Sequence, residues 1–168
     1  MLTKKNLLKL LDTSQIKYKI YDHDPLFTVK DSEQKRGIVK GAHSKNLFLK
    51  NKKNQYFLFS CLENTVVELK KISKSLGLGN LSFANEDSLQ KYLGVNPGSV
   101  TPFGLLNDEE NIVKFFFDYK FLKYEIVNFH PLINTSTIGL SVNRFIDFFL
   151  ENKKKVNIFD FINNSLIE

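Results

Sequence analysis

The sequence predicts an α+β fold: one domain spanning residues 1–168, with a mixed, largely antiparallel sheet and surrounding helices. Short apolar or alternating runs follow one another at hairpin-like spacing, which is typical of antiparallel strands. Helical patterns with capping residues are mixed among these runs, which favours α+β over an all-β or an all-α class. A length of 168 residues is enough for one sizeable hydrophobic core.

The N-terminal part predicts two helices and a strand. An amphipathic helix is expected over Thr3–Leu11, with its first residue as the cap and four leucines on the apolar side. Alternation over Tyr18–Tyr21 predicts a short strand. Thr28 or Asp31 can cap a second helix, which we expect to end near Gly37 because glycine is favoured just beyond a helix.

A hairpin is expected next. The apolar runs Asn46–Leu49 and Gln55–Leu62 flank the polar segment Lys50–Asn54, which predicts two strands joined by a turn. The remaining elements are expected in this order: a helix from Asn64 or Thr65 to Gly77, a strand at Leu81–Ala84, a helix at Glu86–Leu93, strands at Ile112–Phe117, Tyr124–Phe129 and Thr135–Leu140, a helix capped by Ser141, and a strand at Val156–Phe161 followed by frayed terminal residues.

Composition excludes several classes of protein. A hydrophobic content of 42% and a charged content of 25% are ordinary for a globular protein. No apolar run approaches the roughly 20 residues that a membrane span needs, and the N-terminus does not resemble a signal peptide. The single cysteine, Cys61, cannot form an internal disulfide, so we expect a cytoplasmic protein without a membrane partner. Three scattered histidines show no metal-ligand spacing, so no metal and no cofactor are expected.

The net charge of +6 favours a polyanionic partner, because lysine and arginine in excess are commonly used to contact phosphates. Lys50, Lys52 and Lys53 lie on the expected hairpin turn and are candidates to contact a nucleic-acid backbone. A lysine-rich turn is also the common composition of a solvated loop, so charge leaves both interpretations open.

Two segments can recognise a carbonyl or carboxylate group. In Gly98-Ser-Val-Thr-Pro102 a glycine permits close backbone approach, a proline stiffens the turn, and the N–H groups between them can point at an oxygen. The second segment, Gly41-Ala-His-Ser-Lys-Asn-Leu-Phe-Leu49, places Lys45 and Asn46 at the mouth of an apolar strand. A cation at that position can hold an anionic or carbonyl-bearing substrate.

Together with His23-Asp-Pro-Leu-Phe-Thr28, Leu81-Ser-Phe-Ala84 and the segment around His130, these blocks resemble the YbaK/prolyl-tRNA synthetase editing-domain superfamily. The resemblance extends over roughly Asp22 to Phe161. Within the superfamily the chain is most similar to the free-standing ProXp-ala type, which deacylates mischarged Ala-tRNA(Pro). Two positions depart from the pattern: Ser44 replaces a frequent threonine, and Gly139 a bulkier residue.

The resemblance implies a trans-editing aminoacyl-tRNA deacylase whose partners are the acceptor end of tRNA(Pro) and, as a docking partner, prolyl-tRNA synthetase. It implies that Lys45 is needed for activity and that His130 borders the substrate pocket. It also implies that water is positioned by a hydroxyl of the terminal ribose, because no side chain of the motif is an obvious general base.

Several site residues keep a structural alternative. Gly98, Thr101 and Pro102 are candidate substrate-binding residues but also fit an ordinary turn after a Pro-Gly pair. His130 can equally be a neutral core histidine. Asn46 can bind substrate or hold the strand start, and Ser136 can line a small pocket or bond at a strand edge.

Two alternatives to the alanine-specific function also stay open. One is a deacylase for another small residue, cysteine or serine, on tRNA. The other is a non-catalytic module that binds tRNA or a synthetase.

Overall fold

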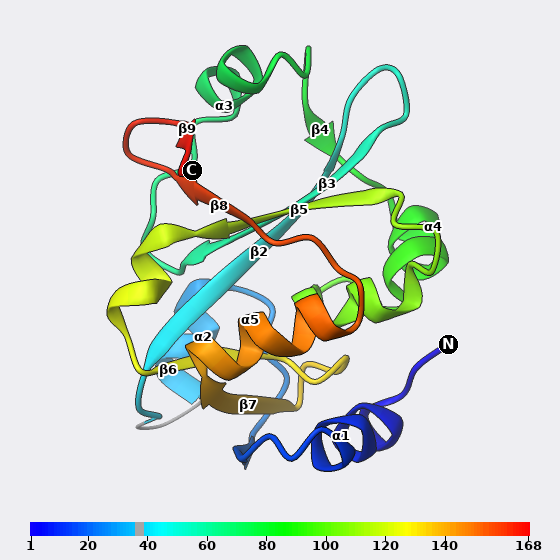
Figure 1. Ribbon diagram of the computed structural model, residues 1–168, viewed down its shortest axis with the longest axis vertical. Coiled ribbons are helices and arrows are strands. Elements are labelled where there is room, and N and C mark those ends of the chain that lie inside the picture. Colours follow the sequence, from blue (N-terminus) through cyan, green and yellow to red (C-terminus); the bar gives the residue numbers. More distant parts are fainter. Residues whose placement is uncertain (36–38) are drawn as a thin grey trace.

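The computed structural model describes residues 1–35 and 39–168 and has one mixed sheet at its centre (Figure 1). Within this part of the chain the strand order is β1-β7-β6-β2-β3-β5-β8-β9, and β4 adds to the outer end of β2. The pairs β2–β6, β3–β5 and β5–β8 are parallel, and the pairs β1–β7, β2–β3, β2–β4, β6–β7 and β8–β9 are antiparallel. The predicted α+β class with a mixed, largely antiparallel sheet is confirmed.

The elements follow the sequence in this order: α1 (Lys4–Thr13), β1 (Tyr18–Asp22), α2 (Val29–Lys35), β2 (Ala42–Lys50), β3 (Tyr56–Leu62), α3 (Leu69–Leu76), β4 (Ser82–Phe83), α4 (Glu86–Ser88) running into a π turn η1 (Leu89–Leu93), a 3₁₀ helix η2 (Pro102–Asn107), β5 (Val113–Asp118), a 3₁₀ helix η3 (Tyr119–Lys123), β6 (Ile126–Phe129), β7 (Ser136–Ser141), α5 (Val142–Glu151), β8 (Asn157–Asp160) and β9 (Ser165–Leu166).

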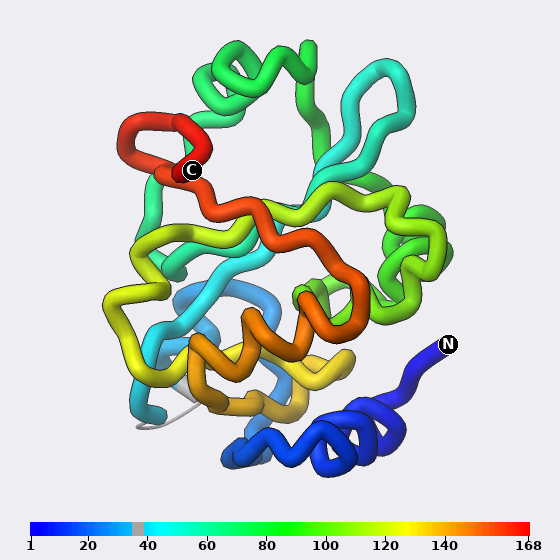
Figure 2. The backbone as a smooth tube through the Cα atoms, viewed as in Figure 1, coloured from blue at the N-terminus to red at the C-terminus, as the bar shows by residue number. Residues whose placement is uncertain are grey.

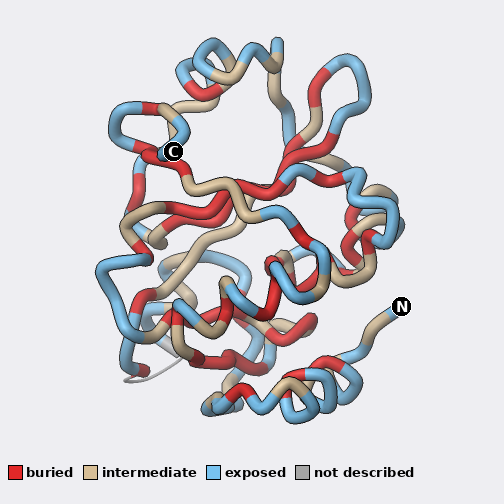
Figure 3. The backbone as a smooth tube through the Cα atoms, viewed as in Figure 1, coloured by how far each residue is buried: buried red, intermediate tan, exposed pale blue. Residues whose placement is uncertain are grey.

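Alternation along the central strands builds a hydrophobic core on each face of the sheet, because successive side chains of a strand point to opposite faces. Phe115 and Phe117 of β5 belong to the larger cluster, which contains α1 and α5. Phe116 between them belongs to the smaller cluster, which α3 and the C-terminal strands cover. Figure 3 shows β3, β5 and the inner side of α5 as largely buried, whereas much of β2 is intermediate.

Capping residues set several helix ends as the sequence predicts. The Thr3 hydroxyl accepts a hydrogen bond from the Asn6 N–H, and the Asn6 side-chain oxygen accepts one from the Thr3 N–H, which satisfies N–H groups at the helix start. Ser141 caps α5 by accepting from the Arg144 N–H at 3.3 Å. Gly77 ends α3 with a φ of +65°, a left-handed conformation that favours glycine.

The third helix starts later than predicted. It begins at Leu69 rather than at Asn64 or Thr65. The Thr65 N–H instead closes a turn on the Leu62 carbonyl, and the Thr65 carbonyl accepts a hydrogen bond from Lys45. Because its backbone groups are used in this way, the segment cannot begin a helix.

The C-terminus does not fray as predicted. Ser165–Leu166 pairs with β8 as an antiparallel strand. The carboxylate of Asp160 accepts from the N–H groups of Ile162 and Asn163 and so holds the turn between the two strands. The predicted helix stop at Gly37 lies outside the described residues.

The hairpin turn of β2–β3 and α3 lie at one end of the molecule, and the start of β2, α2 and β6 lie at the other (Figure 2). Asn51 joins the hairpin turn to the loop after α3 by donating to the Leu78 carbonyl at 2.9 Å. None of the described helices is long and apolar enough to cross a membrane.

Candidate functional site

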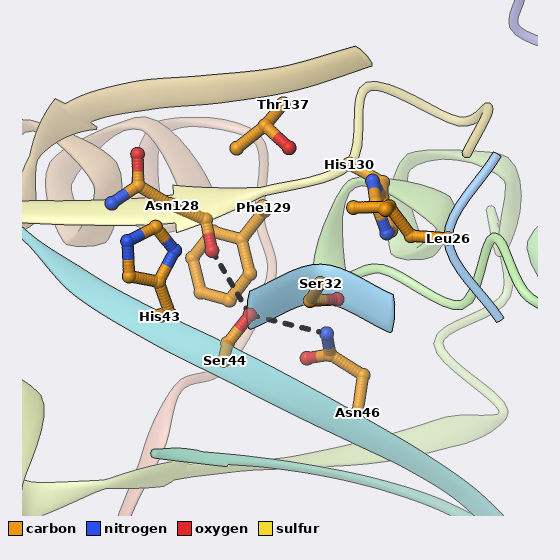
Figure 4. Close-up of a pocket in the computed structure, with 9 residues that line it drawn as sticks. All are labelled: Leu26, Ser32, His43, Ser44, Asn46, Asn128, Phe129, His130 and Thr137. Carbon is orange, nitrogen blue, oxygen red and sulfur yellow. Dashed lines mark hydrogen bonds between the residues drawn. The ribbon is translucent and has the colours of Figure 1, made fainter. Parts of the chain in front are cut away.

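Two adjoining cavities open where the first half of β2 meets α2, β6, β7 and the Gly98 loop. The inner chamber has a volume of about 30 Å³, and the outer opening one of about 230 Å³. The inner chamber is lined by Leu26, Ser32, His43, Ser44, Asn46, Asn128, Phe129, His130 and Thr137 (Figure 4). The outer opening is lined by Leu26, Phe27, Thr28, Val29, Ser32, Ser44, Lys45, Asn46, Gly98, Val100 and His130.

Strand β2 supplies the floor of the site through a chain of hydrogen bonds. The Asn46 amide donates to the Ser44 hydroxyl at 3.3 Å, and that hydroxyl donates to the Asn128 carbonyl at 2.9 Å (Figure 4). The Ser60 hydroxyl of β3 donates to the other end of the Asn46 amide. Since both ends of this amide are held, its second N–H has a fixed direction.

His130 follows β6 and forms the opposite wall. Its Nδ1 lies 2.8 Å from the Ser136 carbonyl, an atom that can only accept, so this nitrogen carries the hydrogen. Burial lowers the pKa of His130, which favours the neutral ring. The neutral ring therefore presents the Nε2 lone pair on the side of the chamber where Ser32 and Asn46 lie (Figure 4).

The Gly98 loop forms the rim of the outer opening. Gly98 has a φ of +87°, and a Cβ added there would lie 2.9 Å from the Phe27 ring and 3.3 Å from the Asn134 amide. The Ser99 N–H closes a turn on the Asn96 carbonyl at 3.0 Å. Within residues 1–35 and 39–168, the N–H groups of Gly98 and Val100 have no protein acceptor, so both are available to an oxygen of a substrate.

Lys45 lies in β2 between the two pocket-facing residues and lines the outer opening. Its ammonium donates to the Thr65 carbonyl, which leaves hydrogens for a further partner. Cys61 is its partner across the hairpin. Burial raises the pKa of the Cys61 thiol to about 12, so this cysteine is no nucleophile near neutral pH.

The family described as "Aminoacyl-tRNA editing domain" matches residues 23–148 of this chain. This segment is most of the chain and includes every residue that lines the two cavities. The chain belongs to the aminoacyl-tRNA editing domain family.

Individual relatives agree with this assignment. The chain is 41% identical over 138 residues to a prolyl-tRNA synthetase associated domain-containing protein of Bos taurus, covering 79% of this chain and 80% of the relative. It is 37% identical over 139 residues to the prolyl-tRNA editing protein ProX of Acetoanaerobium sticklandii, with 82% and 85% coverage. A solved structure described as a candidate trans-editing enzyme for prolyl-tRNA synthetase matches the fold at a TM-score of 0.67 and 18% identity, over 100% of this chain and 99% of that one.

Four of the predicted site residues of this editing domain meet at the cavities: Lys45, Asn46, Gly98 and His130. Three others lie outside the lining. Thr101 and Pro102 are buried, and the Thr101 hydroxyl caps η2 by accepting from the Phe103 N–H at 3.4 Å, so these two residues support the loop from behind.

Ser136, the third of these residues, is fully buried. Its hydroxyl donates to Asp22 at 2.5 Å and accepts from Lys4 at 2.8 Å. Its carbonyl holds His130, so the backbone rather than the hydroxyl of Ser136 contributes to the site. The Ser136 hydroxyl, followed by the Lys4 ammonium, lowers the pKa of Asp22.

The three lysines of the hairpin turn lie at the far end of β2 from the cavities. Lys45 and Lys50 are five residues apart in a strand, which places them about 17 Å from each other. Lys50, Lys52 and Lys53 are therefore too distant to touch a group inside the pocket.

Sequence reasoning missed Asn128 and Ser32 as lining residues. In the sequence, Asn128 has no feature that distinguishes it from an ordinary strand residue. In the structure it is buried, and its amide donates to the Lys40 and Ala42 carbonyls at 2.9 and 3.1 Å. Gly139 is its partner on β7, where a Cβ would lie 2.8 Å from Asn128 Oδ1. The absence of a side chain at Gly139 is what makes room for Asn128. No group of three or more metal-ligating side chains is placed to hold an ion within the described residues.

Proposed function

We propose that the protein, as one editing domain over residues 1–168, hydrolyses the ester of mischarged Ala-tRNA(Pro) in trans. The observation that carries this proposal is the pairing of a very small inner chamber with a wider opening rimmed by Lys45 and the Gly98 loop. In this arrangement the amino acid enters the chamber and the terminal adenosine stays in the opening.

The chamber size favours alanine over proline. A volume of about 30 Å³ holds roughly two water-sized groups. The methyl and ammonium groups on the alanine α-carbon are of that size, whereas the proline ring adds two more methylenes. A proline-shaped synthetase pocket rejects the smaller alanine by only about 1–3 kcal/mol per missing methylene, so a second, smaller site is needed to correct the error.

Three groups that line the outer opening can act on the ester. The N–H groups of Gly98 and Val100 are suited to stabilise the oxyanion that forms when water attacks the carbonyl. The Lys45 ammonium can bind the terminal phosphate or polarise the ester. Water is positioned by a hydroxyl of the terminal ribose of the substrate, in keeping with the lack of a carboxylate in the lining.

The partner in this proposal is the acceptor end of tRNA(Pro), with Lys50, Lys52 and Lys53 contacting the acceptor stem. The net charge of +6 supports a polyanionic partner. Prolyl-tRNA synthetase is proposed as a docking partner and the cytoplasm as the location, because the mischarged substrate is released there.

A deacylation panel tests the proposal. tRNA(Pro) and tRNA(Ala), each charged with alanine, serine, cysteine or proline, are incubated with the protein, and the rate of ester loss is measured against a buffer control. We expect Ala-tRNA(Pro) to be the best substrate. Preference for a cysteinyl or seryl ester would reassign the amino acid, and tRNA binding without any hydrolysis would indicate a non-catalytic module.

A further inference from the structure

Apart from one N–H of the Asn46 amide, the hydroxyl groups and amides of the inner chamber have their hydrogens committed to protein acceptors. The Ser32 hydroxyl donates to the Thr28 carbonyl at 3.2 Å, and the Ser44 hydroxyl donates to the Asn128 carbonyl at 2.9 Å. Once its single hydrogen is donated, a hydroxyl can offer only lone pairs to a ligand.

The Thr137 hydroxyl also has its hydrogen committed, in this case to the ring of His23. His23 Nδ1 lies 2.8 Å from the Asp24 carbonyl, an atom that can only accept, so Nδ1 carries a hydrogen; when this is the only ring hydrogen, Nε2 is an acceptor. That nitrogen lies 2.8 Å from Thr137 Oγ1, so the Thr137 hydroxyl donates to it. His23 thereby fixes the direction of the Thr137 hydrogen, toward its own ring.

His130 adds a further lone pair. Its Nδ1 hydrogen is donated to the Ser136 carbonyl, and Nε2 faces the chamber. Figure 4 shows the Thr137 oxygen on the same side of the chamber as the His130 ring. The two rings of His23 and His130 lie 6.1 Å apart, so the two acceptors are supported by neighbouring histidines.

Asn128 also lines the chamber. Both of its Nδ2 hydrogen bonds go to carbonyl oxygens, which fixes the orientation of the amide. Its Oδ1 is buried and has no hydrogen-bond partner in the described part of the chain. This oxygen is directed at Gly139 of β7 and away from the chamber (Figure 4), so it is not among the acceptors that the chamber offers to a ligand.

A small chamber walled by acceptors selects a ligand group that is rich in hydrogens and positively charged. We propose that the inner chamber binds the α-ammonium group of the aminoacyl ester, with His130 Nε2 and Thr137 Oγ1 as its acceptors. This inference rests on the proposed function and deepens it, because it makes a free α-amino group a requirement of the substrate. The second amide N–H of Asn46, which lines both cavities, adds a donor to the N–H groups of the Gly98 loop.

A matched pair of substrates tests the requirement. Ala-tRNA(Pro) is compared with lactyl-tRNA(Pro), in which a neutral hydroxyl replaces the ammonium at nearly the same volume. Each enzymatic rate is divided by the rate of spontaneous hydrolysis, because the ammonium also activates the ester chemically. We expect the acceleration to be at least tenfold smaller for the lactyl ester. Equal acceleration of the two esters would overturn the inference and would fit a chamber that holds only the attacking water.

A variant locates the recognition. Thr137→Val removes the acceptor at constant shape, and Thr135→Val makes the same change at an exposed position next to the same strand. We expect the ratio of alanyl to lactyl acceleration to fall at least threefold in Thr137→Val and to stay unchanged in Thr135→Val. An unchanged ratio in a folded Thr137→Val protein would remove Thr137 from the site. The wild-type comparison decides the inference even if that variant does not fold.

A binding experiment separates this inference from the proposed function. Non-hydrolysable 3′-amide analogues of alanyl-adenosine and lactyl-adenosine are titrated into the wild-type protein. Tighter binding of the alanyl amide without hydrolysis of Ala-tRNA(Pro) would uphold ammonium recognition and reject the deacylase. Hydrolysis of Ala-tRNA(Pro) combined with equal binding of both amides would uphold the deacylase and reject ammonium recognition.

Discussion

Replacing Gly98 by alanine should reduce turnover far more than it reduces stability. The new Cβ would lie 2.9 Å from the Phe27 ring, which lines the outer opening, and 3.3 Å from the Asn134 amide. An alanine held at a φ of +87° is strained whatever its surroundings, and a left-handed conformation costs about 1–2 kcal/mol. Phe27 is 66% exposed and can swing away, so the contact itself adds little to the loss of folding free energy.

Turnover should suffer for a different reason. The loop N–H groups can stabilise an oxyanion only if the ester approaches them closely, and a misplacement of about 1 Å can cost roughly 100-fold in rate. We therefore expect Gly98→Ala to lower the single-turnover rate with Ala-tRNA(Pro) by about 100-fold. Affinity for tRNA should change little, because phosphate contacts dominate it.

Gly79 provides the matched control. It has a φ of +75°, and an added Cβ would meet nothing within 4 Å. Gly79→Ala should lower the free energy of unfolding, measured by urea denaturation, by a similar amount of about 1–2 kcal/mol and should keep full turnover. Equal effects of the two substitutions on turnover, or full activity in Gly98→Ala, would refute the role given to the loop.

Three further predictions follow from single residues. Lys45→Ala should lower the rate of deacylation by at least about 100-fold and change the free energy of unfolding by no more than roughly 1 kcal/mol. The exposed Lys17→Ala is the control. Full activity of the folded Lys45→Ala protein would exclude this lysine from the site. Burial lowers the pKa of His130, so kcat/KM should stay level as pH falls to the ordinary histidine pKa of about 6.5 and decline only below it. The stability gained from burying the neutral ring is complete above that pH and is lost as pH falls through the lower pKa of the folded protein. A decline in kcat/KM that begins above pH ~6.5 would contradict this prediction. Cys61 is fully buried with a pKa raised to about 12, so a thiol reagent at pH ~8 should label it only after unfolding, and rapid labelling of the native protein would show that β3 is more accessible than described.

The fold could be predicted from local patterns to a large extent, because strand alternation and helix caps act within a few residues. Thr3, Ser141 and Gly77 set helix ends where the sequence predicts them. The start of α3 could not be predicted, since Thr65 is held by a hydrogen bond from Lys45, twenty residues earlier in the chain.

The site shows the same division between local and distant causes. Gly98 and Lys45 stand in recognisable local segments, and the structure brings them to one opening. Asn128 is defined by its partner Gly139 across the β6–β7 pair and by the carbonyls of Lys40 and Ala42, none of which is adjacent in sequence. The tautomers of His23 and His130 depend on carbonyls that only the folded chain places beside them.

The most direct test of the central claim is the ratio of single-turnover rates for Ala-tRNA(Pro) and Pro-tRNA(Pro), measured on the same tRNA at two salt concentrations. The inner chamber of about 30 Å³ should admit alanine and exclude the proline ring, at a cost of roughly 1–3 kcal/mol or more for the overpacked group. The alanyl ester should therefore be cleaved at least about tenfold faster, with 2-aminobutyryl-tRNA(Pro) between the two. Higher salt should weaken the binding of all three aminoacyl-tRNAs alike and leave the order of their cleavage rates unchanged. Cleavage of Pro-tRNA(Pro) as fast as that of Ala-tRNA(Pro), at either salt concentration, would contradict both the size exclusion and the assignment to alanine.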